Sequence, residues 1–194
     1  IRVPGASYEI GVISRNGSYE LNCDYYGSSL HKWLSVPLGS GILWVKKENI
    51  RKIWPLIASG VTDPDNILRL NQIGTHPVYT DLTVTDSIDY YNMLGAERKE
   101  SRLRYLQHYW SGKVRDLPHI IFNTPSDPGR SCAIANVGVK GIKPGELGDL
   151  LFKKYGIYCA PIDGAGVHGC RITPNVYTTT SELDVFVKTL KELG

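Results

Sequence analysis

The chain has 194 residues and a mass of 21.6 kDa, a size that suits one compact domain or parts of two. Hydrophobic residues make up 42% and charged residues 21% of it, so a disordered tail, a collagen-like chain and a coiled coil are excluded. The net charge of +3 is small and spread along the chain, which argues against a nucleic-acid partner. No apolar run approaches the roughly 20 residues that cross a bilayer, so we expect no membrane segment.

The cysteines have none of the close spacings that are typical of a zinc site or of a dense disulfide framework. We therefore expect buried free thiols and no metal at the four positions Cys23, Cys132, Cys159 and Cys170. The chain begins with Ile1 rather than methionine, so we expect a piece or a processed product of a longer protein. The expected location is the cytoplasm, and export stays open.

The first half of the chain reads as the edge of a larger sheet domain. Residues 42–45 are an apolar strand, and residues 48–58 are a helix-like stretch that Pro55 interrupts. Residues 85–114 are rich in helix formers, and Gly95 divides them into two helices suited to connecting two domains. The apolar positions of the second helix are spaced for one face, at Leu103, Leu106, Trp110 and Val114.

The second half alternates strands and helices, which predicts an α/β fold with a small sheet covered by helices on one side. The expected elements are strands 119–123 and 132–139, helix 146–155, strands 157–161 and 170–173, and helix 182–193. Thr179 and Glu182 form a capping box for the last helix. The glycines around residue 165 read as a flexible loop. We place the domain boundary between residues 95 and 96, which gives domains 1–95 and 96–194.

One stretch of the first half carries residues suited to covalent chemistry. Lys32 follows Ser29 and His31 closely and precedes the glycine-containing turn at residues 37–41. A lysine held dry beside such groups has a lowered ammonium pKa and becomes a nucleophile toward an aldehyde. The residues alone leave open that Lys32 is an ordinary solvated lysine.

This stretch resembles the class V aminotransferases of the fold-type I pyridoxal-phosphate superfamily, in particular isopenicillin N epimerase-like and selenocysteine lyase-like proteins. The family's D-[FY]-[FY], S-x-H-K and P-x-G-x-G segments match residues 24–26, 29–32 and 37–41. The resemblance implies the C-terminal part of a fold-type I enzyme: the edge of the large-domain sheet plus a small C-terminal α/β domain. It implies pyridoxal 5′-phosphate as cofactor.

By the same resemblance Lys32 forms a Schiff base with the cofactor and then moves the substrate Cα proton. Ser29 and His31 contact the cofactor phosphate or position the lysine, because hydroxyl and imidazole donors suit phosphate oxygens. The alternatives from the residues alone are a turn-capping hydroxyl for Ser29 and a packed or solvated imidazole for His31.

A Gly-Thr pair at residues 74–75 is similar to a family loop whose threonine reaches the cofactor phosphate across a dimer interface. The resemblance therefore implies a homodimer with Thr75 among the cofactor-binding residues. The alternative is that Thr75 is a plain helix N-cap. His76 stands where relatives often carry arginine, so we assign it no role.

Residues 170–179 are similar to the signature R-[IVA]-S-x-x-x-Y-[NT]-T that precedes the family's final helix. Arg171 would bind the substrate α-carboxylate, since a planar guanidinium gives a carboxylate two parallel hydrogen bonds. The alternative for Arg171 is a surface ion pair.

The resemblance covers residues 21–194 and corresponds to the C-terminal half of a family member, so we expect a missing N-terminal half. Pro4 stands where relatives carry an acid that pairs with the pyridine nitrogen. The implied function is an enzyme that acts on an amino acid, epimerase-like or aminotransferase-like. A cysteine desulfurase or selenocysteine lyase is less favoured, because Cys159 lies in an apolar run and reads as core. The remaining alternative is a truncated, non-catalytic relative that serves as a structural subunit.

Overall fold

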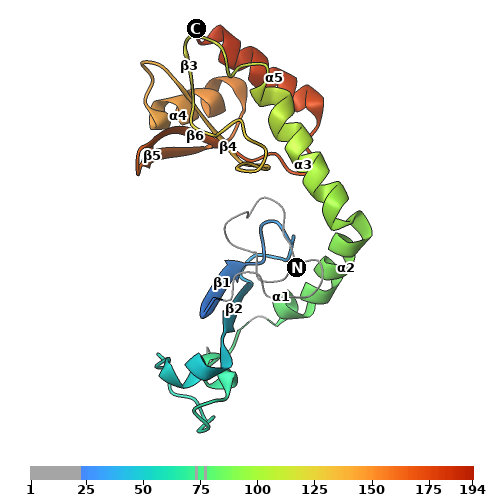
Figure 1. Ribbon diagram of the computed structural model, residues 1–194, viewed down its shortest axis with the longest axis vertical. Helices are drawn as coiled ribbons and strands as arrows, with labels where there is room; N and C mark the ends of the chain where they lie inside the picture. Colours follow the sequence, from blue (N-terminus) through green and yellow to red (C-terminus); the bar gives the residue numbers. More distant parts are fainter. Residues whose placement is uncertain (1–22, 73, 77) are drawn as a thin grey trace. The chain divides into compact units, whose positions relative to one another are not determined.

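The computed structural model describes residues 23–72, 74–76 and 78–194 (Figure 1). The chain divides into two compact units that meet between Leu94 and Gly95. The sequence at Pro4 that departs from the family lies outside the described residues. No helix in the described part of the chain is long and apolar enough to cross a membrane.

The first unit is built on an antiparallel ribbon of β1 (Tyr25–Ser29) and β2 (Gly41–Val45). Short helices follow along the chain: the 3₁₀ helices η1 (Lys47–Lys52) and η2 (Ile67–Leu70), then α1 (Tyr79–Leu82) and α2 (Val84–Leu94). The predicted strand at residues 42–45 is confirmed with one more residue, whereas β1 was not predicted as a strand.

The helix expected over residues 48–58 is wrong, because only η1 forms there. Ile53 ends η1 in an extended conformation, with φ −86° and ψ 126°. Trp54 precedes Pro55, and a residue before proline is sterically biased away from the helical region. The proline therefore ends the helix several residues earlier than the apolar pattern indicates.

The ribbon of β1 and β2 exposes apolar side chains on both of its faces. Tyr25 and Leu43 lie on one face and Ile42 on the other, and each is about half exposed, at 50%, 53% and 49%. An isolated two-stranded ribbon is marginally stable in water. Apolar residues on both faces are typical of strands from a sheet that is covered on both sides, as expected for the edge of a larger sheet.

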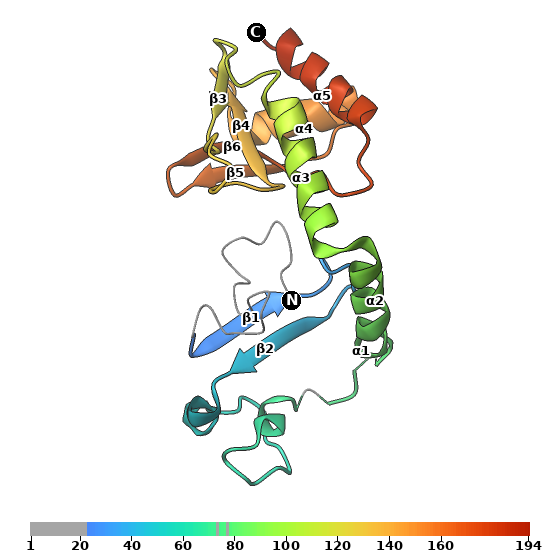
Figure 2. The same ribbon diagram turned by 45° about the vertical axis from the view of Figure 1, so that its right-hand side comes forward.

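The second unit is an antiparallel sheet in the order β3-β4-β6-β5, with helices packed on one face (Figure 2). The predicted alternation of strands and helices is confirmed, with boundaries shifted by a few residues. Gly95, at φ 81°, separates α2 from α3 as predicted. The elements in chain order are α3 (Ala96–Ser111), β3 (Ile120–Phe122), β4 (Ala135–Val139), α4 (Pro144–Tyr155), β5 (Ala160–Gly164), β6 (Val167–Ile172) and α5 (Thr180–Glu192).

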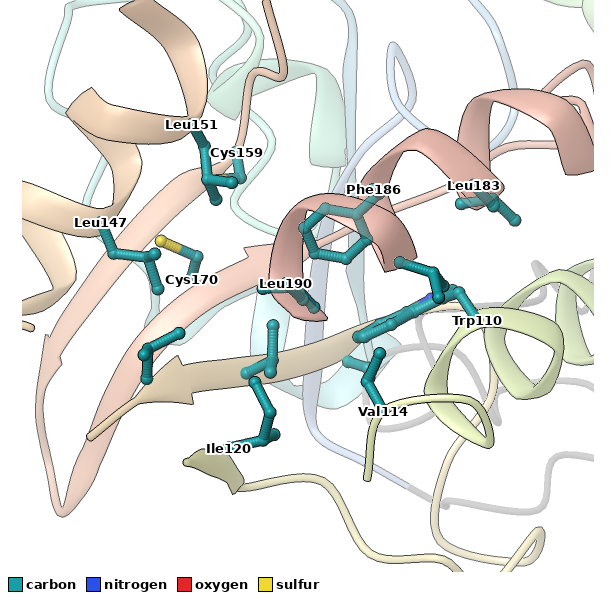
Figure 3. Packing of buried hydrophobic residues seen from close by; sticks show 14 of the residues in the cluster. Trp110, Val114, Ile120, Leu147, Leu151, Cys159, Cys170, Leu183, Phe186 and Leu190 are labelled. Carbon is teal, nitrogen blue, oxygen red and sulfur yellow. The ribbon is translucent and has the colours of Figure 1, made fainter. Parts of the chain in front are cut away.

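The core of the second unit lies between the sheet and its helices (Figure 3). Trp110 is fully buried, with its ring centroid 5.2 Å from that of Phe186 and 5.5 Å from that of Phe122. The predicted apolar face of α3 is confirmed for Leu103, Leu106 and Trp110, which are fully buried. Val114 is fully buried too, but it lies in the turn that follows the end of α3 at Ser111. Every side chain of β4 is buried.

The glycine-rich stretch between β5 and β6 is a tight hairpin turn, so its interpretation as a flexible loop is wrong. Ala165 and Gly166 have φ of 50° and 77° and are the only residues between the two strands. Two consecutive positive φ values are those of the hairpin turn that matches the twist of a strand pair. The turn fixes the register of β6, and thus the position of Arg171 in it.

Candidate active site

The predicted lysine lies in the loop that joins β1 to β2. Ser29 is the last residue of β1 and is exposed. The two ends of the loop are tied together by a hydrogen bond from Leu30 N to Ser40 O of 3.1 Å. The His31 Nδ1 atom lies 3.4 Å from the same carbonyl oxygen. The imidazole therefore donates through Nδ1 at the base of the loop, which leaves Nε2 for another partner.

Lys32 is exposed, and within the described part of the chain its amine makes no hydrogen bond or ion pair. The loop around it is nevertheless anchored, because Leu34 and Val36 are buried at 5% and 3% exposure. Groups that cover this surface would have to supply the desolvation expected for a nucleophilic amine. The amine, the Ser29 hydroxyl and the His31 imidazole fit an aldehyde that carries a phosphate, since one would react and two would donate.

Thr75 is an exposed residue in a bend before α1. The N-cap of α1 is Val78, so the alternative interpretation of Thr75 as the cap of that helix is wrong. The neighbouring His76 is held within its own segment, with Nε2 3.2 Å from Asp81 Oδ2 and Nδ1 3.4 Å from Gly74 O.

Arg171 lies on β6 of the second unit, opposite Asn136 of β4 and Ala160 of β5. Its side chain is exposed, and no acceptor among residues 23–72, 74–76 and 78–194 holds the guanidinium. The alternative of a surface ion pair therefore has no partner within these residues. An arginine without a protein partner is suited to binding an anionic ligand in two-pronged fashion.

The predicted residues do not all come together in one described site. Ser29, His31 and Lys32 share the β1–β2 loop, Thr75 lies in a separate bend of the same unit, and Arg171 belongs to the other unit. The sequence analysis passed over Asn136, which faces Arg171 across the sheet. The signal for it was a lone amide in an otherwise small and apolar strand.

The thiols of the second unit are core groups. Cys159 is 8% exposed and Cys170 is fully buried, as expected for free thiols, and Cys132 is buried too. Contact with the Cys159 sulfur and burial both raise the pKa of the Cys170 thiol, which keeps it protonated. Cys23 is only half-buried and so departs from the expectation.

His168 and the possible metal ligands of the chain do not form a further candidate site. His168 is exposed on β6, and its Nδ1 lies 2.5 Å from Asp163 Oδ1 across the hairpin. The described residues include no cluster of three or more histidine, cysteine and acidic side chains that could hold a metal ion.

Comparison with known families identifies the chain. A family model described as Aminotransferase class-V matches residues 17–186, and the chain belongs to this family. An isopenicillin N epimerase of Streptomyces clavuligerus is 27% identical over 188 residues, covering 88% of this chain and 47% of that protein. A cysteine desulfurase of Wigglesworthia glossinidia brevipalpis is 27% identical over 192 residues, covering 88% of this chain and 45% of its own length.

Solved structures give the same fold. A cystine C-S lyase in complex with its reaction product, cysteine persulfide, has a TM-score of 0.73 at 20% identity, over 90% of this chain and 48% of that one. A cysteine desulfurase from Thermococcus onnurineus has a TM-score of 0.69 at 20% identity, over 89% of this chain and 47% of its own. The chain thus spans about half the length of the relatives that it matches.

The expected family and fold class are confirmed, since the chain belongs to the class-V aminotransferases and shares the fold of solved structures of which it covers about half. Pyridoxal 5′-phosphate is the cofactor of this class of proteins, and in one solved relative glycine is covalently linked to it. The expected cofactor is confirmed at this level.

Proposed function

We propose that the protein is a pyridoxal 5′-phosphate-dependent enzyme that acts on an amino acid, with Lys32 as the residue that carries the cofactor. The observation behind this proposal is an exposed lysine that pairs with none of the described residues and stands on an anchored loop, in a chain of the class-V aminotransferase family. When bound, the cofactor supplies an electron sink that makes the substrate Cα–H acidic.

We assign each predicted site residue a role that follows from the chemistry of its side chain. Ser29 donates to phosphate oxygens through its hydroxyl, and His31 does so through Nε2 when both of its ring nitrogens carry protons, because the Nδ1–H is directed at Ser40 O. Thr75 adds a hydroxyl. Lys32 accepts and returns a proton at its amine nitrogen, which is the role of a general base placed beside the substrate Cα. Arg171 binds the substrate carboxylate through its two parallel N–H groups.

An epimerase-like and an aminotransferase-like reaction would both use this set of residues, so the set does not distinguish them. A cysteine desulfurase is supported by one curated relative, but residues 157–169 offer only the core thiol of Cys159. A persulfide carrier needs an accessible thiolate, so this second candidate is the weaker one. A structural subunit without catalysis stays the other alternative.

The two compact units fit the domains expected for the family. We assign the first unit to the C-terminal part of the large cofactor-binding domain and the second to the small domain. A homodimer, a further N-terminal half of the same protein and a cytoplasmic location stay predictions.

The decisive experiment is borohydride reduction of the purified protein with added pyridoxal 5′-phosphate, followed by peptide mass spectrometry. We expect the cofactor mass on Lys32. The variant Lys32→Ala should lose this label, whereas Lys47→Ala, which removes another exposed lysine of the same unit, should keep it. A protein whose Lys32 peptide stays unlabelled would not be an enzyme of this kind.

A further inference from the structure

The open face of the small sheet carries a row of polar residues directly across its strands. The pairing of β4 with β6 places Asn136 opposite Arg171, and the pairing of β5 with β6 places Ala160 opposite Arg171 on the other side. Asn123 follows β3 in the register that faces Asn136. Directly opposed residues of antiparallel strands share a face, so these side chains rise from the same side of the sheet, away from the helices.

The next row on this face is flattened by two adjacent glycines in the central strands. A Cβ on Gly169 would lie 2.5 Å from Asn136 Oδ1 and 2.6 Å from Val137 O, and one on Gly138 would lie 2.9 Å from His168 O. The Asn136 side chain therefore lies over the bare backbone of Gly169. This space exists only because residue 169 has no side chain.

The orientation of the Asn136 carboxamide is fixed by its neighbour. Asn123 Nδ2 donates to Asn136 Oδ1 at 2.7 Å and to His168 O at 3.0 Å. Because the amino end of Asn123 faces two acceptors, the atom that Asn136 presents to it must be the oxygen. The Asn136 backbone is held as well, since its N–H donates to Thr124 Oγ1 at 2.8 Å.

The amino end of Asn136 is left with no partner. The residue is 9% exposed, and its Nδ2 atom is buried without an acceptor within the described part of the chain. A buried donor without a partner is costly and rare in native structures. Its cross-strand neighbour, Arg171, is exposed and also has no acceptor among the described residues. The Asn136 amide and the Arg171 guanidinium are thus neighbouring donors without an acceptor among the described residues, and an anionic oxygen would suit both.

We propose that Asn136 is a second carboxylate-binding residue, and that its Nδ2 and the Arg171 guanidinium share the substrate carboxylate. This inference rests on the proposed function. Arg171 is exposed and no acceptor among the described residues holds it, so its guanidinium can turn toward a carboxylate that also reaches the amide on the neighbouring strand. Asn123 and Gly169 are positioning residues, since the first orients the amide and the second leaves room for it.

The test compares two probes that differ only in the carboxylate, L-alanine and ethylamine, titrated against the cofactor-loaded protein by its absorbance. For Asn136→Leu we expect the Kd of L-alanine to rise about tenfold or more, as for a lost hydrogen bond to a charged group. The Kd of ethylamine should stay within about twofold. Asn92→Leu, at an exposed asparagine of α2, should change neither value. An equal change for both probes would overturn the inference.

Asn136→Asp covers the case in which the leucine variant does not fold. It keeps the size of the side chain and the oxygen that faces Asn123, but replaces the donor with a second carboxylate oxygen. L-alanine should then bind at least about tenfold more weakly than to the unmodified protein, because a donor is lost and the two carboxylates repel. A purely structural role predicts unchanged L-alanine binding in this variant, and that result would reject the inference.

A readout independent of catalysis is the side-chain NH₂ signal of Asn136 in asparagine-labelled protein. L-alanine should shift this NMR signal and ethylamine should not; equal responses to the two probes would count against the inference.

The outcomes also distinguish failure of this inference from failure of the proposed function. An unlabelled Lys32 in the unmodified protein removes the proposed function. Labelled Lys32 with normal L-alanine affinity in both Asn136 variants removes only this inference.

Discussion

Asn136 and Arg171 stand directly opposite each other on β4 and β6, on the face of the small sheet that no helix covers. The amide is buried and the guanidinium is exposed. Because the two residues are cross-strand neighbours, a substitution at either one alters the same polar surface of the sheet. The pairing of β4 with β6 creates it, and the two-residue turn between β5 and β6 fixes the register of β6 against its other neighbour, β5.

Substitution of Arg171 should weaken substrate binding without harming the fold. A charge-assisted pair with a carboxylate is worth about 1.5–3 kcal/mol, so Arg171→Ala should raise the Kd of L-alanine about tenfold or more. Arg171→Lys should restore little of it, since an ammonium lacks the two-pronged geometry. Spectral titration measures both values. Arg98→Ala, at an exposed arginine of α3, is the control, and an unchanged Kd in Arg171→Ala would remove this residue from the site.

Gly169 should not tolerate a methyl group. Its Cβ would meet the Val137 carbonyl oxygen at 2.6 Å and carbonyl carbon at 2.8 Å, and the central strands have little room to separate. Overpacking of this kind costs about 1–3 kcal/mol. We expect Gly169→Ala to lower the urea midpoint clearly. Gly164→Ala in the same hairpin, where a Cβ meets nothing within 4 Å, should change it little; equal midpoints for the two variants would show that the strands yield.

The same substitution at Gly148 of α4 should have the opposite sign. A Cβ there would lie 3.6–3.8 Å from the Pro161 ring, which is ordinary van der Waals contact. Alanine in a helix interior is favoured over glycine by about 0.8–1.0 kcal/mol. Gly148→Ala should therefore raise the free energy of unfolding by about that amount in urea titrations. A destabilised variant would mean that α4 and β5 pack more tightly than these distances indicate.

The capping box of α5 predicts a pH dependence with a definite sign. The Thr179 N–H donates to Glu182 Oε2 at 2.7 Å, and this bond, with one from the Thr179 hydroxyl, lowers the pKa of Glu182 from its ordinary value. A carboxyl group whose pKa is lower in the folded state stabilises the fold above its unfolded pKa, and this contribution is lost as the pH falls through the folded value.

Glu182→Gln removes this charge and keeps the size of the side chain. The melting temperature of the unmodified protein should exceed that of the variant near pH 7, and the gap should close as the pH falls through the lowered pKa of Glu182, where the glutamate protonates in the folded protein. The other acids are common to both proteins and cancel in the difference. Thermal melts across this range measure the gap, and a constant gap would contradict the assigned pKa shift.

The helices were predictable because their signals are local. The apolar spacing on α3, the capping box of α5 and the glycine before α3 can all be read within a few residues of sequence. β1 could not be found in this way, because its Tyr-Tyr-Gly-Ser-Ser sequence includes glycine and serine, which are poor strand formers. It is a strand because β2 pairs with it.

The same limit applies to the candidate site. Lys32 and Arg171 were visible in the sequence because each stands in a segment similar to a family signature. Asn136 was not, since its partner is 35 positions away in the chain and only the strand register brings them together. A free donor also leaves no trace in sequence, because it is defined by the contacts that the fold does not make.

The loop that carries Lys32 is closed by main-chain groups. Leu30 N donates to Ser40 O at 3.1 Å, and Val36 N donates to Leu30 O at 3.3 Å, so the loop is closed by backbone groups that every residue type except proline provides. In evolutionary terms, the exposed Leu38 takes part in neither bond, so this position can vary while the loop stays closed.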